Sequence, residues 1–287
     1  MNRFSLNIKG RLWHIEKPLV MGIINVTPDS FYSNSRAFSY NTIKEQADKQ
    51  IADGADIIDL GGYSSRPGAT EVSADEEYYR LAKGLEIIRK DYPNIPISID
   101  TFRANVAHRC ISEWNADIVN DISGGNLDPE MWQLIAEMNV PYILMHMRGT
   151  PQSMQSECNY NDVTADIIYD LSEKISKLHT LGVNDIIIDP GFGFAKNLEQ
   201  NYQLMSELEH LQCFGKPILA GISHKSMIYK LLNTSPENAL NGTTVLNTIA
   251  LLKGASILRI HDVKEAVETI KIVEKIKEYT PQTPYLI

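Results

Sequence analysis

The chain has 287 residues, of which 43% are hydrophobic and 22% are charged, and its formal net charge is −9. This composition is typical of a globular protein with a substantial core, and the acidic balance without any Lys/Arg run argues against nucleic acid or an anionic membrane as a partner. No apolar stretch reaches the roughly 18 residues of a membrane span, and the first residues lack the apolar core of a signal peptide.

The three cysteines are Cys110, Cys158 and Cys213, which lie far apart and have no metal-ligand spacing. An odd number of scattered cysteines favours a reducing compartment, in which each is a small apolar packing residue. We therefore expect a cytoplasmic protein.

Residues 1–18 predict a β-hairpin. Phe4–Ile8 and Leu12–Ile15 alternate apolar and polar residues around Lys9-Gly10-Arg11, and Pro18 ends the second strand. We expect this hairpin to cover the floor of the fold that follows.

From residue 19 onward, short β-branched runs alternate with stretches of helical periodicity. The strands are expected at Leu19–Val26, Asp56–Gly61, Pro96–Thr101, Asp117–Ile122, Pro141–His146, Asp185–Pro190, Pro217–Ile222 and Ser256–His261. The helices are expected at 42–53, 73–90, 103–114, 128–138, 162–181, 197–209, 237–253 and 263–278.

Eight strand–helix pairs with near-continuous apolar strands predict a closed parallel sheet covered by helices. The length of each unit, (287 − 18)/8 or about 34 residues, fits an α/β fold of the (β/α)8 TIM-barrel type. We expect a single domain over residues 1–287, with the hairpin at 1–18 and the barrel at 19–280. A doubly wound open sheet would need a glycine-rich fingerprint after the first strand, and Asn25-Val26-Thr27-Pro28-Asp29 is not one.

Every predicted strand ends on polar residues. They are Asn25, Asp59, Asp100, Asn120 with Asp121, His146, Asp189, Ser223 with Lys225, and Arg259 with His261. Because the carboxyl ends of barrel strands converge, we expect these residues to form one site, although a single polar end could equally cap a helix. His146 stays open between a site role and packing.

The residue types indicate what this site holds. Inward carboxylates and carboxamides at Asp100, Asn120 and Asp189 suit a flat heterocycle with several hydrogen-bonding groups. Arg259 and His261, two residues apart on one strand, suit a phosphate or diphosphate. Lys225 and Ser226, at the start of a helix, offer a second anion site. Loops Asn25–Phe31 and Gly61–Ala69 are either ordinary linkers or a mobile lid over the site.

At these residues the sequence resembles the dihydropteroate synthase family, in order and at the family's spacing, from about residue 19 to 267. The segments that carry the resemblance are NVTPDSF (25–31), IDLGGYSSRPGA (58–69), IDTF (99–102), VNDISG (119–124), LMHMRGTPQSM (144–154), IDPGFGF (188–194), GISHKS (221–226), GTTVLN (242–247) and LRIHDV (258–263). The family joins a dihydropterin diphosphate to p-aminobenzoate in folate biosynthesis, and the resemblance implies this activity here.

The resemblance also implies residue roles. The pterin would be bound by Asp100, Asn120, Met145, Asp189, Lys225 and Arg259. The diphosphate would be bound by Asn25, Ser65, Arg259 and His261. The p-aminobenzoate would be bound by Phe31, Arg66, Pro67, Phe194 and Ser226. The chemistry would be carried by Asp100, Lys225, Arg259 and His261, with Asn25 as a ligand of Mg²⁺. Sulfonamides would be competitive inhibitors, and the protein would be a homodimer.

The sequence departs from the family pattern in four places. Tyr63 stands where the family has Glu, Ser65 where it has Thr, Tyr32-Ser33-Asn34 where it has Ser-Asp-Gly, and His224 where it has Arg. An imidazole is mostly neutral at pH 7, so we expect a weaker positive charge beside the p-aminobenzoate carboxylate.

Two alternatives remain open at this point. A methyltetrahydrofolate-binding methyltransferase barrel shares the pterin-binding carboxylates, but it has no use for the Arg259 and His261 pair. A barrel that binds pterins without converting them is motivated by His224 and the altered first loop.

Overall fold

The structure, a computed structural model, describes residues 4–26, 36–64 and 71–279. Strands β1 (Phe4–Ile8) and β2 (Arg11–Ile15) pair antiparallel, with Phe4 opposite Ile15. The predicted hairpin is therefore confirmed, and the rest of the described chain alternates between strands and helices.

Eight parallel strands form the second sheet. They are β3 (Leu19–Asn25), β4 (Ile57–Gly61), β5 (Ile97–Asp100), β6 (Ile118–Asp121), β7 (Tyr142–Met145), β8 (Ile186–Asp189), β9 (Leu219–Ala220) and β10 (Ile257–Ile260). Their order is β8-β7-β6-β5-β4-β3-β10-β9. A single parallel bridge between Ile188 and Ile218 joins β8 to the segment that enters β9, with the Ile188 N–H donating to the Pro217 carbonyl at 2.9 Å. We call this junction the β8–β9 seam, and it closes the predicted barrel.

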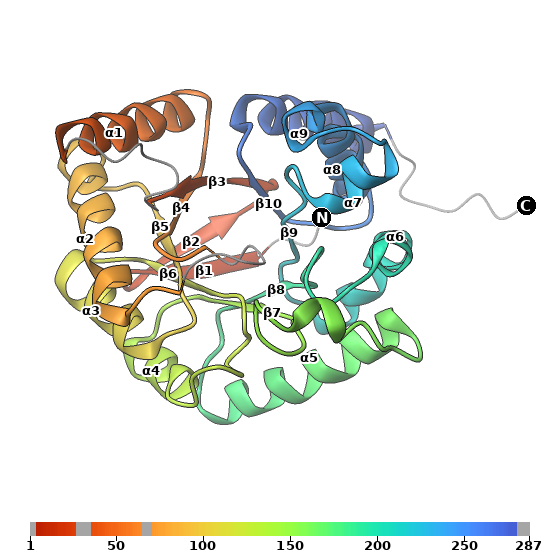
Figure 1. The fold of residues 1–287 in the computed structure, drawn as a ribbon, viewed down its shortest axis with the longest axis horizontal. Coiled ribbons are helices and arrows are strands. Elements are labelled where there is room, and N and C mark those ends of the chain that lie inside the picture. The colour runs from red at the N-terminus through yellow and green to blue at the C-terminus, as the bar shows by residue number, and fades with distance from the viewer. Residues whose placement is uncertain (1–3, 27–35, 65–70, 280–287) are drawn as a thin grey trace, which may run out of the picture.

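Helices surround the barrel (Figure 1). They are α1 (Arg36–Ala52), α2 (Ala74–Asp91), α3 (Ala104–Trp114), α4 (Met131–Met138), α5 (Val163–Thr180), α6 (Leu198–Ser206), α7 (Ser226–Leu231), α8 (Leu240–Leu252) and α9 (Val263–Glu278), with 3₁₀ turns η2 (Met154–Ser156), η3 (Leu208–Phe214) and η4 (Pro236–Asn238). Most bounds match the expected ones. Helix α1 begins at Arg36 rather than at residue 42, and the expected helix 237–253 divides into η4 and α8.

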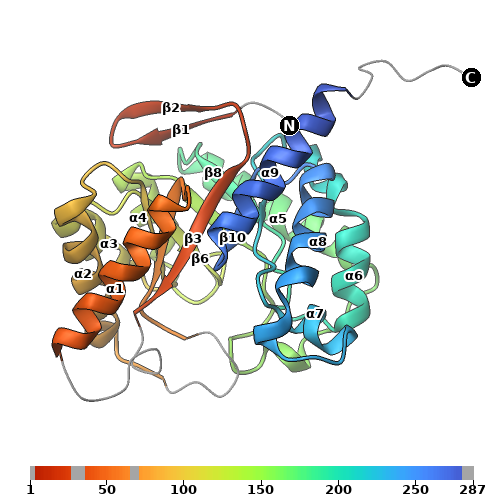
Figure 2. The ribbon, with the colours of Figure 1, turned by 90° about the horizontal axis from the view of Figure 1, so that it is seen from above.

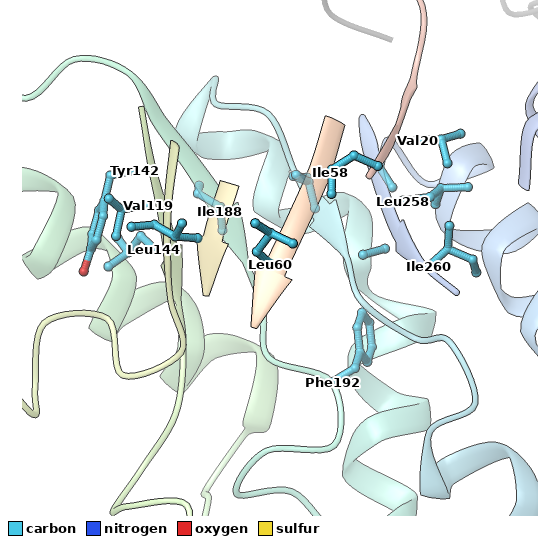
Figure 3. Packing of buried hydrophobic residues seen from close by; sticks show 14 of the residues in the cluster. Val20, Ile58, Leu60, Val119, Tyr142, Leu144, Ile188, Phe192, Leu258 and Ile260 are labelled. Carbon is cyan, nitrogen blue, oxygen red and sulfur yellow. The ribbon is translucent and has the colours of Figure 1, made fainter. Parts of the chain in front are cut away.

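Side chains of the barrel strands alternate between two apolar layers, because successive residues of a strand point to opposite faces. One set packs outward against the helices; it includes Val20, Ile58, Leu60, Val119, Tyr142, Leu144, Ile188, Leu258 and Ile260 (Figure 3). The other set fills the barrel interior; it comprises Leu19, Met21, Ile57, Ile118, Ile143, Ile187, Leu219 and Ile257.

The hairpin covers the amino-terminal end of the barrel strands (Figure 2). Leu6 and Ile15 belong to the same buried cluster as the interior layer, and Trp13 packs against it. Asn7 also donates its backbone N–H to the Asp185 carboxylate at 3.1 Å. The apolar end of the interior is thus closed, and polar groups can gather only at the opposite end, which we call the mouth. No helix in the described part of the chain is long and apolar enough to cross a membrane.

Candidate active site

The interior layer continues toward the mouth with mostly polar residues. Because side chains alternate along a strand, the residue two positions after each residue of this interior layer also faces the interior. Beyond the interior layer itself, these positions hold Ile23, Asp59, Asn120, Met145, Asp189, Gly221 and Arg259. Alternation on β5 adds Asp100 to this set.

A buried ion-pair network lies at the centre of the mouth. The Arg259 guanidinium donates from Nε to Asp59 Oδ2 at 2.6 Å and from Nη2 to Asp100 Oδ2 at 2.8 Å. Asn120 Nδ2 donates to the same Asp59 oxygen at 3.2 Å. Four strands therefore contribute to one polar cluster, as the sequence predicted for Asp100, Asn120 and Arg259.

Burial dominates the pKa shifts of two carboxyl groups at the mouth, Asp100 and Asp189. It raises the pKa of Asp100 to about 7, although the Arg259 charge acts in the opposite direction. Burial likewise raises the pKa of Asp189, against the attraction of Lys225. Such shifts are typical of functional sites, where charged groups that are partly removed from water act more strongly on a ligand.

Lys225 adds a basic side chain to the mouth, beside the loop that follows β8. Its Nζ donates to the Phe192 carbonyl and lies 4.6 Å from the centre of the Phe194 ring. Burial lowers the pKa of Lys225 to about 8, while the Asp189 carboxylate opposes the shift. Lys225, Asp189 and Phe194, which were predicted to share a site, thus lie together.

Gly221 lies between Asp189 and Arg259 at the mouth, and we call the space beside it, which a side chain would fill, the slot. A Cβ added there would lie 3.7 Å from Asp189 Oδ2 and 4.0 Å from Arg259 Cβ. Met145, which is almost fully buried, belongs to an apolar cluster at the same end of the barrel, and Phe194 packs against that cluster. The slot therefore has polar edges beside an apolar surface.

His261 and Asn25 lie beside a cavity of about 250 Å³ that also contacts α1. Ser223 Oγ is 2.8 Å from His261 Nδ1 and accepts the His261 backbone N–H at 3.2 Å. Of the expected diphosphate residues, Asn25, Arg259 and His261 end neighbouring strands, because β10 pairs with β3. Ser65 and the p-aminobenzoate candidates Phe31, Arg66 and Pro67 lie outside the described residues, whereas Ser226 is the first residue of α7.

Two strand-end residues, Asp121 and His146, do not face the interior. The expectation that all polar strand ends form the site is therefore wrong for Asp121, and for His146, which the sequence leaves open, the structure favours packing. Asp121 accepts the N–H groups of Ser123 and Gly125 at 2.8 Å and the Tyr142 hydroxyl at 2.7 Å. His146 is only 1% exposed, and burial lowers its pKa well below the usual value. Both residues follow an interior residue by one position, which turns them toward the helices.

Lys196 is a residue that sequence reasoning missed. Its buried Nζ donates to the carbonyls of Gly191 and Phe194, each at 2.9 Å, and lies 3.2 Å from His146 Nδ1. Burial lowers the pKa of Lys196 to about 7. The Lys196 side chain therefore holds the loop that carries Phe194 through two buried hydrogen bonds to its backbone. No spacing signal marks Lys196. Asp59, which the sequence groups with the other strand ends without a stated role, accepts from both Arg259 and Asn120.

Tyr63, one of the departures from the family pattern, connects three loops at the mouth. Its hydroxyl accepts from Gln152 Nε2 at 3.1 Å, and its ring meets the Phe102 ring edge-on at 5.2 Å. The Arg103 guanidinium lies 5.5 Å from the Tyr63 ring centre. Tyr63 thus fixes the start of the second long loop.

The described residues contain no group of three or more His, Cys, Asp or Glu side chains that could hold a metal ion.

Comparisons with known proteins agree with this geometry. The family model described as pterin binding enzyme matches residues 21–261. Dihydropteroate synthase of Escherichia coli (strain K12) is 40% identical over 272 residues, which are 94% of this chain and 95% of that protein. The enzyme of the same name from Bacillus subtilis (strain 168) is 42% identical over 261 residues, 90% of this chain and 88% of the relative.

Solved structures give the same result. The Yersinia pestis dihydropteroate synthase in complex with a sulfonamide drug has a TM-score of 0.88 and 37% identity, covering 96% of this chain and 100% of that one. The Xanthomonas albilineans enzyme with 4-aminobenzoic acid has a TM-score of 0.88 and 33% identity, covering 98% and 100%. The chain therefore belongs to the dihydropteroate synthase family of pterin-binding enzymes.

Proposed function

We propose that this enzyme condenses 6-hydroxymethyl-7,8-dihydropterin diphosphate with p-aminobenzoate, giving 7,8-dihydropteroate and diphosphate. The observation that carries the proposal is the grouping of two carboxylates, Asp100 and Asp189, with Lys225 and Arg259 at the mouth around Gly221. Relatives crystallised with 4-aminobenzoic acid and with 7,8-dihydropteroate support the same substrates.

The pterin ring would lie in the slot. Its N–H groups can donate to the Asp100 and Asp189 carboxylates, and its acceptor atoms can receive bonds from Asn120 Nδ2 and Lys225 Nζ. Met145 supplies apolar contact to the ring, and the Arg259 guanidinium can lie against its face. These six residues account for the donors, acceptors and faces of a flat heterocycle.

The leaving diphosphate would lie toward His261 and Asn25, with Ser65 as a further ligand. The bond between the pterin methylene carbon and the diphosphate oxygen breaks, and its electron pair stays on the oxygen, where the Arg259 and His261 donors stabilise the charge. The resulting cation is delocalised into the ring, and the Asp100 carboxylate opposes its charge. The amine nitrogen of p-aminobenzoate then forms the new C–N bond and releases a proton.

Mg²⁺ fits this arrangement as a cofactor with few protein ligands. Asn25 would supply one carboxamide oxygen at the end of β3, and waters with diphosphate oxygens would supply the remaining positions. When bound, Mg²⁺ neutralises charge on the leaving group. Calorimetry with diphosphate should show binding that weakens strongly when Mg²⁺ is chelated, and Asn25→Ala should abolish that Mg²⁺ dependence.

The p-aminobenzoate would lie nearer the surface. Phe194 offers a ring face and Ser226 a hydroxyl near its carboxylate, and Phe31, Arg66 and Pro67 would close over it. The Yersinia pestis relative carries a sulfonamide drug, and we propose that sulfonamides compete with p-aminobenzoate here as well.

We also propose that the enzyme is a homodimer in a reducing compartment such as the cytoplasm. Seven large apolar side chains on α7, α8 and α9, or directly after them, are half or more exposed; they are Leu231, Leu232, Val245, Leu252, Ile272, Ile276 and Tyr279. The cysteines are free thiols, as expected in such a compartment. Light scattering should give twice the chain mass, and Val245→Glu with Ile272→Glu should give the monomer mass.

The decisive experiment measures diphosphate release with both substrates present. Release that requires p-aminobenzoate and yields dihydropteroate supports the proposed reaction. Tight pterin diphosphate binding without any release would instead favour a pterin-binding barrel that lacks turnover. Binding of methyltetrahydrofolate, with no effect of diphosphate, would favour the methyltransferase-type alternative.

A further inference from the structure

His224 lies in the turn between β9 and α7, immediately before Lys225. Its φ of 52° is in the left-handed region, which residues other than glycine adopt uncommonly. The His224 backbone N–H donates to Thr243 Oγ1 of α8 at 3.2 Å. A strained conformation of this kind persists where surrounding contacts fix it, and the ring supplies the strongest of these contacts.

Both ring nitrogens of His224 face oxygen atoms. Nδ1 lies 2.5 Å from the Pro236 carbonyl oxygen, and Nε2 lies 2.6 Å from Asp262 Oδ2. A carbonyl oxygen and an ionised carboxylate can only accept hydrogen bonds. A neutral imidazole has a single N–H, so it would leave one nitrogen lone pair against an oxygen. Only the doubly protonated ring satisfies both contacts.

We propose that His224 is a positioning residue that acts as an imidazolium cation and ties the turn carrying Lys225 and Ser226 to the start of α9. We call its contacts with Pro236 and Asp262 the His224 bridge. The inference rests on the proposed function for what the turn binds, whereas the bridge itself is a property of the free protein.

Asp262 supports this assignment. It is the residue that precedes α9, a position where an Asp side chain usually caps the helix, yet it makes no side-chain cap bond. Its carboxylate bonds to His224 instead. Because Asp262 directly follows His261, the His224 bridge connects the two loops that hold the proposed anion-binding groups.

The acidic groups around the ring favour its protonated form. Asp262 lies at the start of α9 and Glu237 lies on η4, while Lys225 follows in the same turn and the His261 ring meets the His224 ring edge-on at 5.8 Å. Burial of the ring lowers its pKa, but the Pro236 carbonyl and the Asp262 carboxylate outweigh burial, so the pKa of His224 is raised. The bridge is therefore intact below this raised pKa and is lost as the pH rises through it.

This assignment changes the expectation that His224 is a mostly neutral imidazole beside the p-aminobenzoate carboxylate. Because both ring nitrogens bond to protein oxygens, the ring affects the substrate only by positioning Lys225 and Ser226. An Arg at this position would keep the charge at every pH, whereas His makes the placement of the turn dependent on pH.

The first test is an NMR titration of the protein with labelled histidine rings, in which the His224→Gln variant identifies the His224 signal by its loss. We expect the His224 ring to titrate above the ordinary value of about 6.5, and Asp262→Asn to lower that midpoint. A midpoint at or below the ordinary value, or one that Asp262→Asn leaves unchanged, would overturn the proposal. Neither measurement needs turnover, so the result is independent of whether the proposed reaction occurs.

The second test compares kinetics across pH. In the wild-type enzyme, the KM for p-aminobenzoate should rise several-fold as the pH passes the His224 midpoint. His224→Arg should remove this rise, and the matched control His210→Arg, at an exposed residue of η3, should keep it. A KM that rises equally in wild type and His224→Arg would contradict a positioning role, even where the NMR titration shows a cationic ring.

Discussion

At the mouth of the barrel, two carboxylates share one guanidinium. Arg259 contacts Asp59, which is fully buried, and Asp100, which is one-fifth exposed. A lysine could not replace Arg259 here, because its ammonium lacks the planar fork that reaches both acceptors at once. The three groups together carry one negative charge when both acids are ionised. That excess is available to stabilise a positive charge on a bound substrate.

Replacing Asp100 by Asn tests this use of charge. The variant keeps the shape of the side chain and should retain most pterin binding, but kcat should fall by roughly 10²–10³-fold, as for other lost electrostatic groups. Because the pKa of Asp100 is about 7, wild-type kcat should decline as the pH falls through this value and the carboxylate becomes protonated. The variant should lack this decline. An unchanged kcat would show that Asp100 only shapes the slot.

Lys196→Met tests the support beneath Phe194. Methionine keeps the length of the stem, but it leaves the carbonyls of Gly191 and Phe194 without their buried donor. We expect the KM for p-aminobenzoate to rise and the free energy of unfolding to fall by about 1–3 kcal/mol. The exposed control Lys90→Met should change neither quantity. Equal effects of the two substitutions would mean that Lys196 has no specific role in placing the loop.

At the scale of whole elements, the pattern of the strands explains what the sequence could and could not predict. All eight barrel strands were located, since each is a short apolar run between polar loops. A strand buried on both faces shows no alternation, however, so the sequence alone does not tell which residue faces the interior. The sequence therefore groups Asp121 with the site although it faces the helices, leaves His146 open, and groups Asp59 with the site without indicating its role. The expected start of the first helix, residue 42, is later than the Arg36 start of α1, because apolar periodicity begins only near Ile43.

The substitution Gly221→Ala tests whether the pterin ring binds in the slot, which lies at the ends of β8, β9 and β10. The added methyl group would make ordinary contacts with Asp189 and Arg259 in the free protein, so the melting temperature should hardly change. It would occupy space that we assign to the pterin ring, and the Kd for pterin diphosphate should rise at least about 10-fold. Calorimetry and thermal unfolding measure the two quantities separately. Undiminished affinity would place the ligand elsewhere in the mouth.

For the whole molecule, the hairpin matters for stability rather than for chemistry. It closes the interior at the end opposite the active site, and its buried side chains belong to the same cluster as the barrel floor. Lys9 also lies 3.1 Å from the buried Asp117 carboxylate, which accepts the Ile97 N–H at 2.8 Å. From these shared contacts we expect the hairpin and the barrel to unfold as a single domain.

Leu6→Ala should lower the free energy of unfolding by about 2–5 kcal/mol, because Leu6 is 1% exposed and its truncation leaves a cavity. The matched control is Leu12→Ala in the same hairpin, where the side chain is 62% exposed and the expected change is within about 0.5 kcal/mol. Denaturant unfolding should show one transition in both variants, and kcat should match that of wild type. Two transitions would show that the hairpin is a separate unit.

Ligand binding should change the rate of backbone hydrogen exchange at the β8–β9 seam. It has a single bridge, at Ile188, and it lies directly below the slot that Asp189 and Gly221 border. Opening of the barrel should therefore begin at this junction, where the fewest hydrogen bonds must break. A ligand that spans the slot would hold both sides together, so hydrogen exchange of the Ile188 amide should slow on pterin binding while exchange between β4 and β5 stays constant. Occupancy of the active site could then be followed by exchange at one backbone amide, without any measurement of catalysis.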